Sequence, residues 1–148
     1  MSDQEFASKA SEVLKGDALN NALAFAKHLD ENDMIAIGGS VIGEGKTLCY
    51  FHLDGSSDYP GPWTIWTDGE CDYSAEHPDV PVSDEEKEIA WANANICASC
   101  GGSCSPGIQK VIFGKAFDNV CSSAMAFNNP DSKTLECVKK LLEMNLKA

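Results

Sequence analysis

Four cysteines in the second half of the sequence are the residues best placed to do chemistry. Cys97 and Cys100 form a Cys-x2-Cys pair followed by glycines, and Cys104 and Cys121 come after them. A pair with this spacing lets both sulfurs face one cation, and small neighbours let backbone N–H groups approach the thiolates. The pattern predicts a closed, tetrahedral, structural zinc site with these four cysteines as ligands, in a cysteine-rich segment spanning 97–121.

Other interpretations of the cysteines stay open, because zinc ribbons usually present two separated Cys-x2-Cys pairs. A thiol-dependent oxidoreductase would use Cys97 and Cys100 as a dithiol. We expect a helix to end at about this pair, however, and its negative end would raise a thiol pKa. The spacing matches neither ferredoxin pattern for an iron–sulfur cluster. Plain burial without a metal is the third interpretation, and it is the one we expect for Cys49 and Cys137.

Aromatic residues on two predicted strands offer a second place for chemistry. The strands at 48–53 and 63–67 place side chains alternately on two faces, so Trp63 and Trp66 point to opposite sides. We expect core packing for most of these aromatic residues. If one tryptophan fills the core, the other, with Tyr50 or His52, would line a shallow apolar pocket for a small ligand.

Nucleotide binding and a catalytic triad are not predicted. Gly45-Lys46-Thr47 resembles the end of a phosphate-binding loop, but Ser40 stands where that motif needs a glycine, and a strand follows instead of a helix. We expect a β-turn there. The three histidines are scattered along the chain, and no Ser-His-Asp or Cys-His arrangement can be assigned from their order.

The charge of the chain limits its partners. It has 148 residues with 23 acidic side chains against 11 basic ones, which gives a net charge of −12, and every basic residue is a lysine. An acidic surface without arginine repels nucleic acid and anionic membranes. No run approaches the roughly 18 apolar residues of a membrane span, and the start lacks the features of a secretory signal. We therefore expect a cytoplasmic protein whose partner is a small molecule or another protein.

The hydrophobic periodicity predicts one α+β domain over 1–148, with helices packed on a mainly antiparallel sheet. The expected order is two helices, three strands, a helix, the cysteine loop, two strands and a last helix. A capping box of Ser83 and Glu86 marks the start of the third helix, whose inward face would carry Ile89, Ala92 and Ile96. The acidic segment 72–82 has no period and is predicted to be a mobile surface loop. The expected strands are 34–41, 48–53, 63–67, 110–113 and 120–127.

The C-terminal third resembles a group of uncharacterised bacterial proteins. The resemblance rests on Trp91, Cys97-x2-Cys100-Gly101, the run Ile112-Phe113-Gly114-Lys115, and Asn119-Val120-Cys121, with Phe127-x-Asn129-Pro130-Asp131 before a lysine-containing helix. It implies a bacterial protein of unknown function and assigns no catalytic residue.

Together these observations predict a non-enzymatic binding or structural module with a zinc site. A thiol-dependent oxidoreductase and a small-ligand-binding protein that uses the aromatic strands are the alternatives.

Overall fold

The computed structural model describes residues 2–53, 63–68, 71–96 and 107–147. Within these ranges the chain forms four helices and seven strands, which confirms the predicted α+β class. The helices are α1 (Ser2–Val13), α2 (Gly16–Glu31), α3 (Asp84–Ala92) and α4 (Ser132–Lys147). The strands are β1 (Met34–Ile37), β2 (Ser40–Gly43), β3 (Lys46–Leu53), β4 (Trp63–Thr67), β5 (Ala94–Ile96), β6 (Ile108–Ile112) and β7 (Lys115–Asn128).

The sheet is antiparallel throughout, in the order β1-β2-β3-β4-β7-β5, and β6 also pairs with β7. The first four strands follow one another in sequence, as expected when short turns connect them. One of these turns contains Glu44 and Gly45, which both have positive φ. This two-residue turn confirms that Gly45 belongs to a β-turn and not to a phosphate-binding loop.

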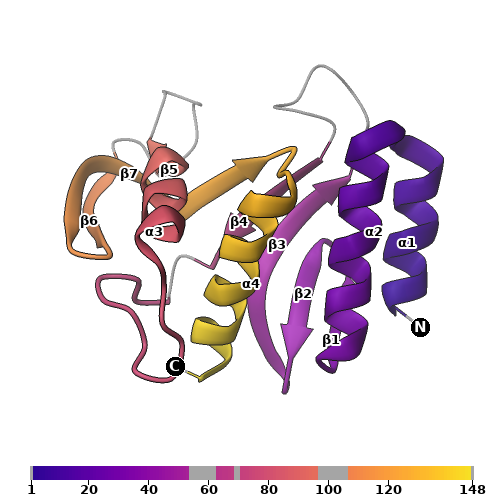
Figure 1. Ribbon diagram of the computed structural model, residues 1–148, viewed down its shortest axis with the longest axis horizontal. Helices are drawn as coiled ribbons and strands as arrows, with labels where there is room; N and C mark the ends of the chain where they lie inside the picture. Colours follow the sequence, from indigo (N-terminus) through magenta and orange to yellow (C-terminus); the bar gives the residue numbers. More distant parts are fainter. Residues whose placement is uncertain (1, 54–62, 69–70, 97–106, 148) are drawn as a thin grey trace.

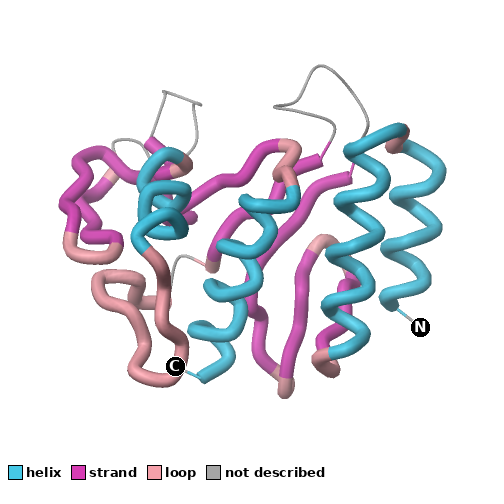
Figure 2. The backbone as a smooth tube through the Cα atoms, viewed as in Figure 1, coloured by secondary structure: helices cyan, strands magenta, loops and turns pink. Residues whose placement is uncertain are grey.

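The helices cover one face of the sheet. α1 and α2 pack against β1, α4 packs against β3, and α4 also contacts α2 and α3 (Figures 1 and 2). The core between these layers centres on Phe6, whose ring lies edge-on to Phe25 at 5.9 Å, Phe51 at 5.0 Å and Trp63 at 6.1 Å between ring centroids. Trp63 is therefore the tryptophan that fills the core.

The predicted strand at 34–41 is two strands. Gly38 and Gly39 both have positive φ and form a two-residue turn inside that run, so β1 and β2 pair as a hairpin. On β1 the side chains alternate between buried and exposed. A single strand across this run was therefore wrong, because two consecutive residues with positive φ reverse the chain.

The third helix begins as predicted and ends earlier. Ser83 accepts a hydrogen bond from the Glu86 N–H at 3.1 Å, and the Glu86 carboxylate accepts one from the Ser83 N–H at 2.9 Å, which confirms the capping box. The helix stops at Ala92, where Asn93 donates its amide to the Ile89 carbonyl at 2.8 Å. The predicted inward face was therefore wrong for two residues, because Ala92 is exposed and Ile96 lies on β5 with its side chain exposed.

The last two predicted strands are confirmed and are longer than expected. β6 and β7 are joined by a two-residue turn at Phe113 and Gly114, both with positive φ. The last helix also has the predicted stripe, since Leu135, Val138, Leu141 and Leu142 are all buried. None of the helices in the described part of the chain is long and apolar enough to cross a membrane.

β7 creates the candidate site, because different strands pair with different parts of its length. β5 follows one edge, with Ala94 opposite Met125 and Ile96 opposite Val120. On the other edge, β4 pairs with residues 126–128 and β6 pairs with residues 115–120. No described strand pairs with residues 121–125 on that second edge, so β4 and β6 are separated by a gap.

Candidate ligand cleft

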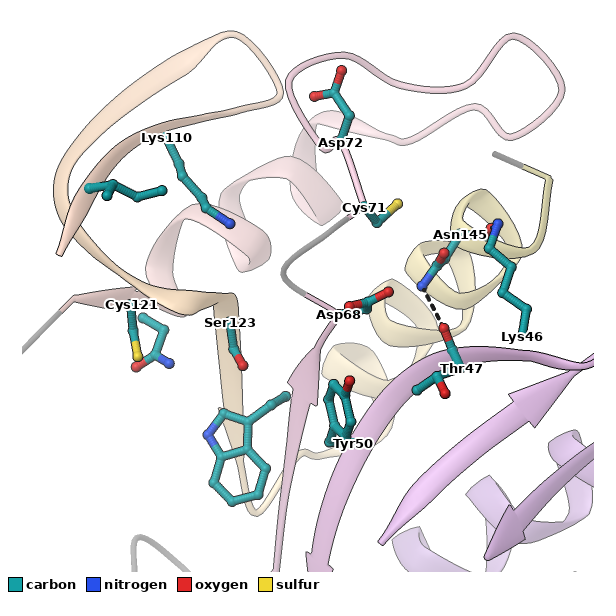
Figure 3. Close-up of a pocket in the computed structure, with 13 residues that line it drawn as sticks. Lys46, Thr47, Tyr50, Asp68, Cys71, Asp72, Lys110, Cys121, Ser123 and Asn145 are labelled. Atoms are coloured by element: carbon teal, nitrogen blue, oxygen red, sulfur yellow. Dashed lines mark hydrogen bonds between the residues drawn. The ribbon is translucent and has the colours of Figure 1, made fainter. Parts of the chain in front are cut away.

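A cleft of about 1260 Å³ opens at the gap between β4 and β6 (Figure 3). Cys121 and Ser123, two positions apart on β7, both line it, as the alternation of a strand requires. The other described lining residues lie on the strands β3, β4, β5 and β6, on α4, and in the segment that follows β4. They are Lys46, Thr47, Tyr50, Trp66, Asp68, Cys71, Asp72, Asn95, Ile108, Lys110 and Asn145.

Two aromatic side chains form one wall of the cleft. Tyr50 and Trp66 lie directly opposite each other on β3 and β4, so their side chains are neighbours on the same face of the sheet. This face is opposite to the one where Trp63 packs against the helices. The side chain of Tyr50 is 41% exposed, and the His52 ring lies edge-on to Trp66 at 6.4 Å between centroids. The predicted opposite directions of the two tryptophans are confirmed, since Trp63 lies in the core and Trp66 lines the cleft with Tyr50. The use of this surface for a small ligand stays a prediction.

The start of β3 and the end of α4 form a second, polar wall. Asn145 is only 2% exposed. Its side-chain amide donates to the Leu48 carbonyl at 2.8 Å and more weakly to the Thr47 carbonyl at 3.4 Å. Lys46 donates from its ammonium group to the Asn145 main-chain carbonyl, where a cation also complements the negative end of the helix. These bonds hold Lys46, Thr47 and Asn145 in place at the cleft.

The segment after β4 forms a third wall, and it is packed more tightly than predicted. The Phe113 N–H donates to the Tyr73 carbonyl at 2.8 Å, and the Gly114 N–H donates to the Ser74 carbonyl at 2.9 Å. Tyr73, Val80 and Val82 are buried. The segment 72–82 lacks regular helix and strand, as predicted for a surface loop. Three of its side chains nevertheless reach the core, which a segment without a hydrophobic period did not indicate.

Cys71 places a thiol in the cleft that is poorly suited to nucleophilic chemistry. Burial raises its pKa, Asp68 adds to this effect, and a hydrogen bond with the Tyr73 side chain opposes it. The pKa of Tyr73 is itself raised, first by burial and then by the neighbouring Cys71. Because thiolates rather than thiols attack electrophiles, a raised pKa makes Cys71 a weak nucleophile at neutral pH.

The charged side chains of the cleft balance one another. Its described lining contains two lysines, Lys46 and Lys110, and two aspartates, Asp68 and Asp72. The Asp72 carboxylate accepts the Ser74 N–H at 2.9 Å, and this hydrogen bond holds the pKa of Asp72 below its usual value. Two lysines against two aspartates give the described lining no formal net charge, although the whole chain carries −12.

The structure describes one of the four predicted zinc ligands. Cys121 is half-buried on β7 and lines the cleft, whereas Cys97, Cys100 and Cys104 lie outside the described residues. In the described ranges, no group of three or more His, Cys, Asp or Glu side chains is arranged to hold a metal ion. The zinc site therefore stays a prediction.

The premise used against redox chemistry at Cys97 was wrong. We expected a helix to end at about Cys97, whereas α3 ends at Ala92 and β5 follows it. Cys97 itself lies outside the described residues. The use of Cys97 and Cys100 by an oxidoreductase remains a prediction. The interpretation of the other two cysteines is confirmed, since Cys49 and Cys137 are both buried.

Sequence reasoning did not identify Asn145, Asp68 or Cys71 as lining residues. Asn145 is a polar interruption in the apolar face of α4, and this was the one signal that could have indicated a buried hydrogen bond.

No protein-family model matches the chain, and neither curated proteins nor solved structures give a significant match.

Proposed function

We propose that this protein binds a small, ring-bearing ligand in the cleft between β4 and β6. The observation that carries the proposal is the gap on the edge of β7, which opens beside the exposed Tyr50 and the half-buried Trp66. Ligand sites in proteins are concave, combine apolar or aromatic surface with a few placed polar groups, and are largely preformed. The cleft has these properties.

Each wall of the cleft contributes a different kind of contact to the proposed binding. Tyr50 and Trp66 offer flat apolar surface for a ring, and Lys110 and Asp68 reach the cleft from opposite strands to contact polar substituents. The hydrogen bonds of Asn145 to the start of β3 fix one wall, and those of Tyr73 to the hairpin turn fix another. Such preorganisation lowers the entropic cost of binding.

The test is a titration of isotope-labelled protein with matched ring compounds, followed by amide chemical shifts. Indole-3-acetate, tryptamine and methyl glucoside sample a negative, a positive and a neutral ring probe. At least one should shift the amides of Tyr50, Trp66 and Ser123 at millimolar concentration, and Trp66→Ala should abolish the shift. Ile37→Ala, an exposed residue of β1 outside the cleft lining, is the control. Shifts confined to other surfaces, or none at up to about 10 mM, would refute the proposal.

A structural zinc site is the second candidate, supported by where the described chain stops and resumes. Ile96 and Ile108 pair with Val120 from the two edges of β7, and the Gly107 N–H donates to the Asn119 side chain at 2.7 Å. Both ends of the segment that carries Cys97, Cys100 and Cys104 thus flank the residue next to Cys121. This adjacency suits a site in which four thiolates share one ion.

Elemental analysis of protein purified without added metal tests the zinc candidate. Stoichiometric zinc, and loss of both zinc and stability in Cys121→Ser, are expected. Cys71→Ser is the matched control, because Cys71 is also a half-buried thiol in the cleft but is not a predicted ligand. Absence of zinc from the wild type would end this candidate and leave the ligand cleft unaffected.

A further inference from the structure

We infer that the ligand of the cleft is a neutral oligosaccharide, an inference that rests on the proposed function. A sugar ring has one face of C–H groups, which packs on aromatic rings, and a rim of hydroxyls, which need paired donors and acceptors. The cleft offers both, because Tyr50 and Trp66 lie side by side on a sheet face while Asp68, Asn95 and Lys110 also line it.

The aromatic pair suits a chain of rings better than a single ring. The two side chains are directly opposite on neighbouring strands, a pairing that places Cβ atoms about 5 Å apart. The two side chains therefore place aromatic surface at two neighbouring positions of the same sheet face. His52 packs edge-on against Trp66 and supports the ring from the side, so the platform is held in place before a ligand arrives.

The polar groups fit hydroxyls better than a charged ligand. Carboxylates accept hydrogen bonds, lysines donate them, and amides do both, and the cleft contains all three in Asp68, Lys110 and Asn95. Because the two lysines and two aspartates of the described lining cancel, neither an anion nor a cation gains a net electrostatic attraction there.

The charge of the protein also distinguishes between two kinds of polymer that pack on aromatic side chains, oligosaccharides and single-stranded nucleic acids. Single-stranded nucleic acid stacks its bases on such rings, but its backbone requires a positive groove. The chain has a net charge of −12 and no arginine, and the described cleft lining adds no net positive charge. A polyphosphate is repelled from this surface, whereas an uncharged glycan is not.

The experiment compares four probes on the intact chain by amide chemical shifts and calorimetry. Cellotetraose and maltotetraose are neutral oligosaccharides with flat and curved chains, a thymidine tetranucleotide is the anionic polymer, and indole-3-acetate is a ring without sugar chemistry. At least one tetrasaccharide should bind in the cleft and weaken by about tenfold or more in Trp66→Ala and Tyr50→Ala. Ile37→Ala should bind as the wild type does.

Each other outcome overturns a defined part of the reasoning. If indole-3-acetate shifts cleft amides and neither tetrasaccharide does, the oligosaccharide inference is wrong and the ligand cleft stands. If the tetranucleotide binds as tightly as a tetrasaccharide, the charge argument is wrong. Tetrasaccharide binding that survives Trp66→Ala in a folded variant contradicts the aromatic platform. If no ring probe or oligosaccharide binds, both the inference and the proposed function fall.

Discussion

Replacement of Asn145 by alanine should destabilise the fold by about 1–2 kcal/mol. The Asn145 amide makes one good hydrogen bond, to the Leu48 carbonyl at 2.8 Å, and one weak one, to the Thr47 carbonyl at 3.4 Å. A bond of this kind contributes about 0.5–1.5 kcal/mol net, and an unsatisfied buried carbonyl costs about 1–3 kcal/mol. Two effects reduce the sum: alanine has a helix propensity better by roughly 0.6 kcal/mol, and water in the cleft can reach part of the vacated site.

Urea denaturation followed by circular dichroism measures this loss, and thermal unfolding should show a decrease in Tm of about 3–6 °C for a chain of this size. Asn20→Ala is the matched control, since Asn20 is an exposed position of α2. It should be neutral or stabilising by up to about 0.6 kcal/mol. Asn145→Asp should cost more than Asn145→Ala, because it keeps the size of the side chain and places an acceptor against two carbonyls.

The result that refutes this reasoning is an Asn145→Ala protein whose unfolding free energy lies within about 0.5 kcal/mol of wild type, which is the usual range for surface substitutions. In that case the hydrogen bonds to β3 do not stabilise the attachment of α4, and the polar wall of the cleft is not preorganised by them.

Three further predictions concern other parts of the fold. Ser83→Ala should lower the unfolding free energy by about 1 kcal/mol in urea denaturation, because the Glu86 N–H loses its capping acceptor. Burial lowers the pKa of His28 below 6.5. As the pH falls, the His28 imidazole is therefore protonated at a higher pH in the unfolded chain than in the folded one. The urea midpoint should therefore fall as the pH drops below about 6.5, and His28→Gln should reduce the fall. Burial raises the pKa of Cys137 to about 12 and also raises that of Cys49. At about pH 8 iodoacetamide should leave both unmodified in the native protein and label both in urea, and peptide mass spectrometry would expose an error if either reacts rapidly in the folded state.

Local patterns in the sequence were enough for the helices and for most strands. The capping box at Ser83 and the apolar stripe of α4 depend on side chains within a few positions of one another, so the sequence shows them directly. The same is true of the opposite directions of Trp63 and Trp66, since alternation along a strand is a local property. At Gly38 and Gly39, the prediction of one continuous strand missed the turn between β1 and β2.

The amino-acid sequence by itself determined the α+β class, the net charge of −12, and the opposite directions of Trp63 and Trp66. Only the tertiary structure decided that β7 is shared by β4 and β6, and that the gap between them brings Tyr50, Lys110 and Asn145 together. The physical reason is that a strand carries information about its own two faces but not about which strands occupy its edges. Edge pairing depends on the register and length of distant strands, and here it is what makes a cleft.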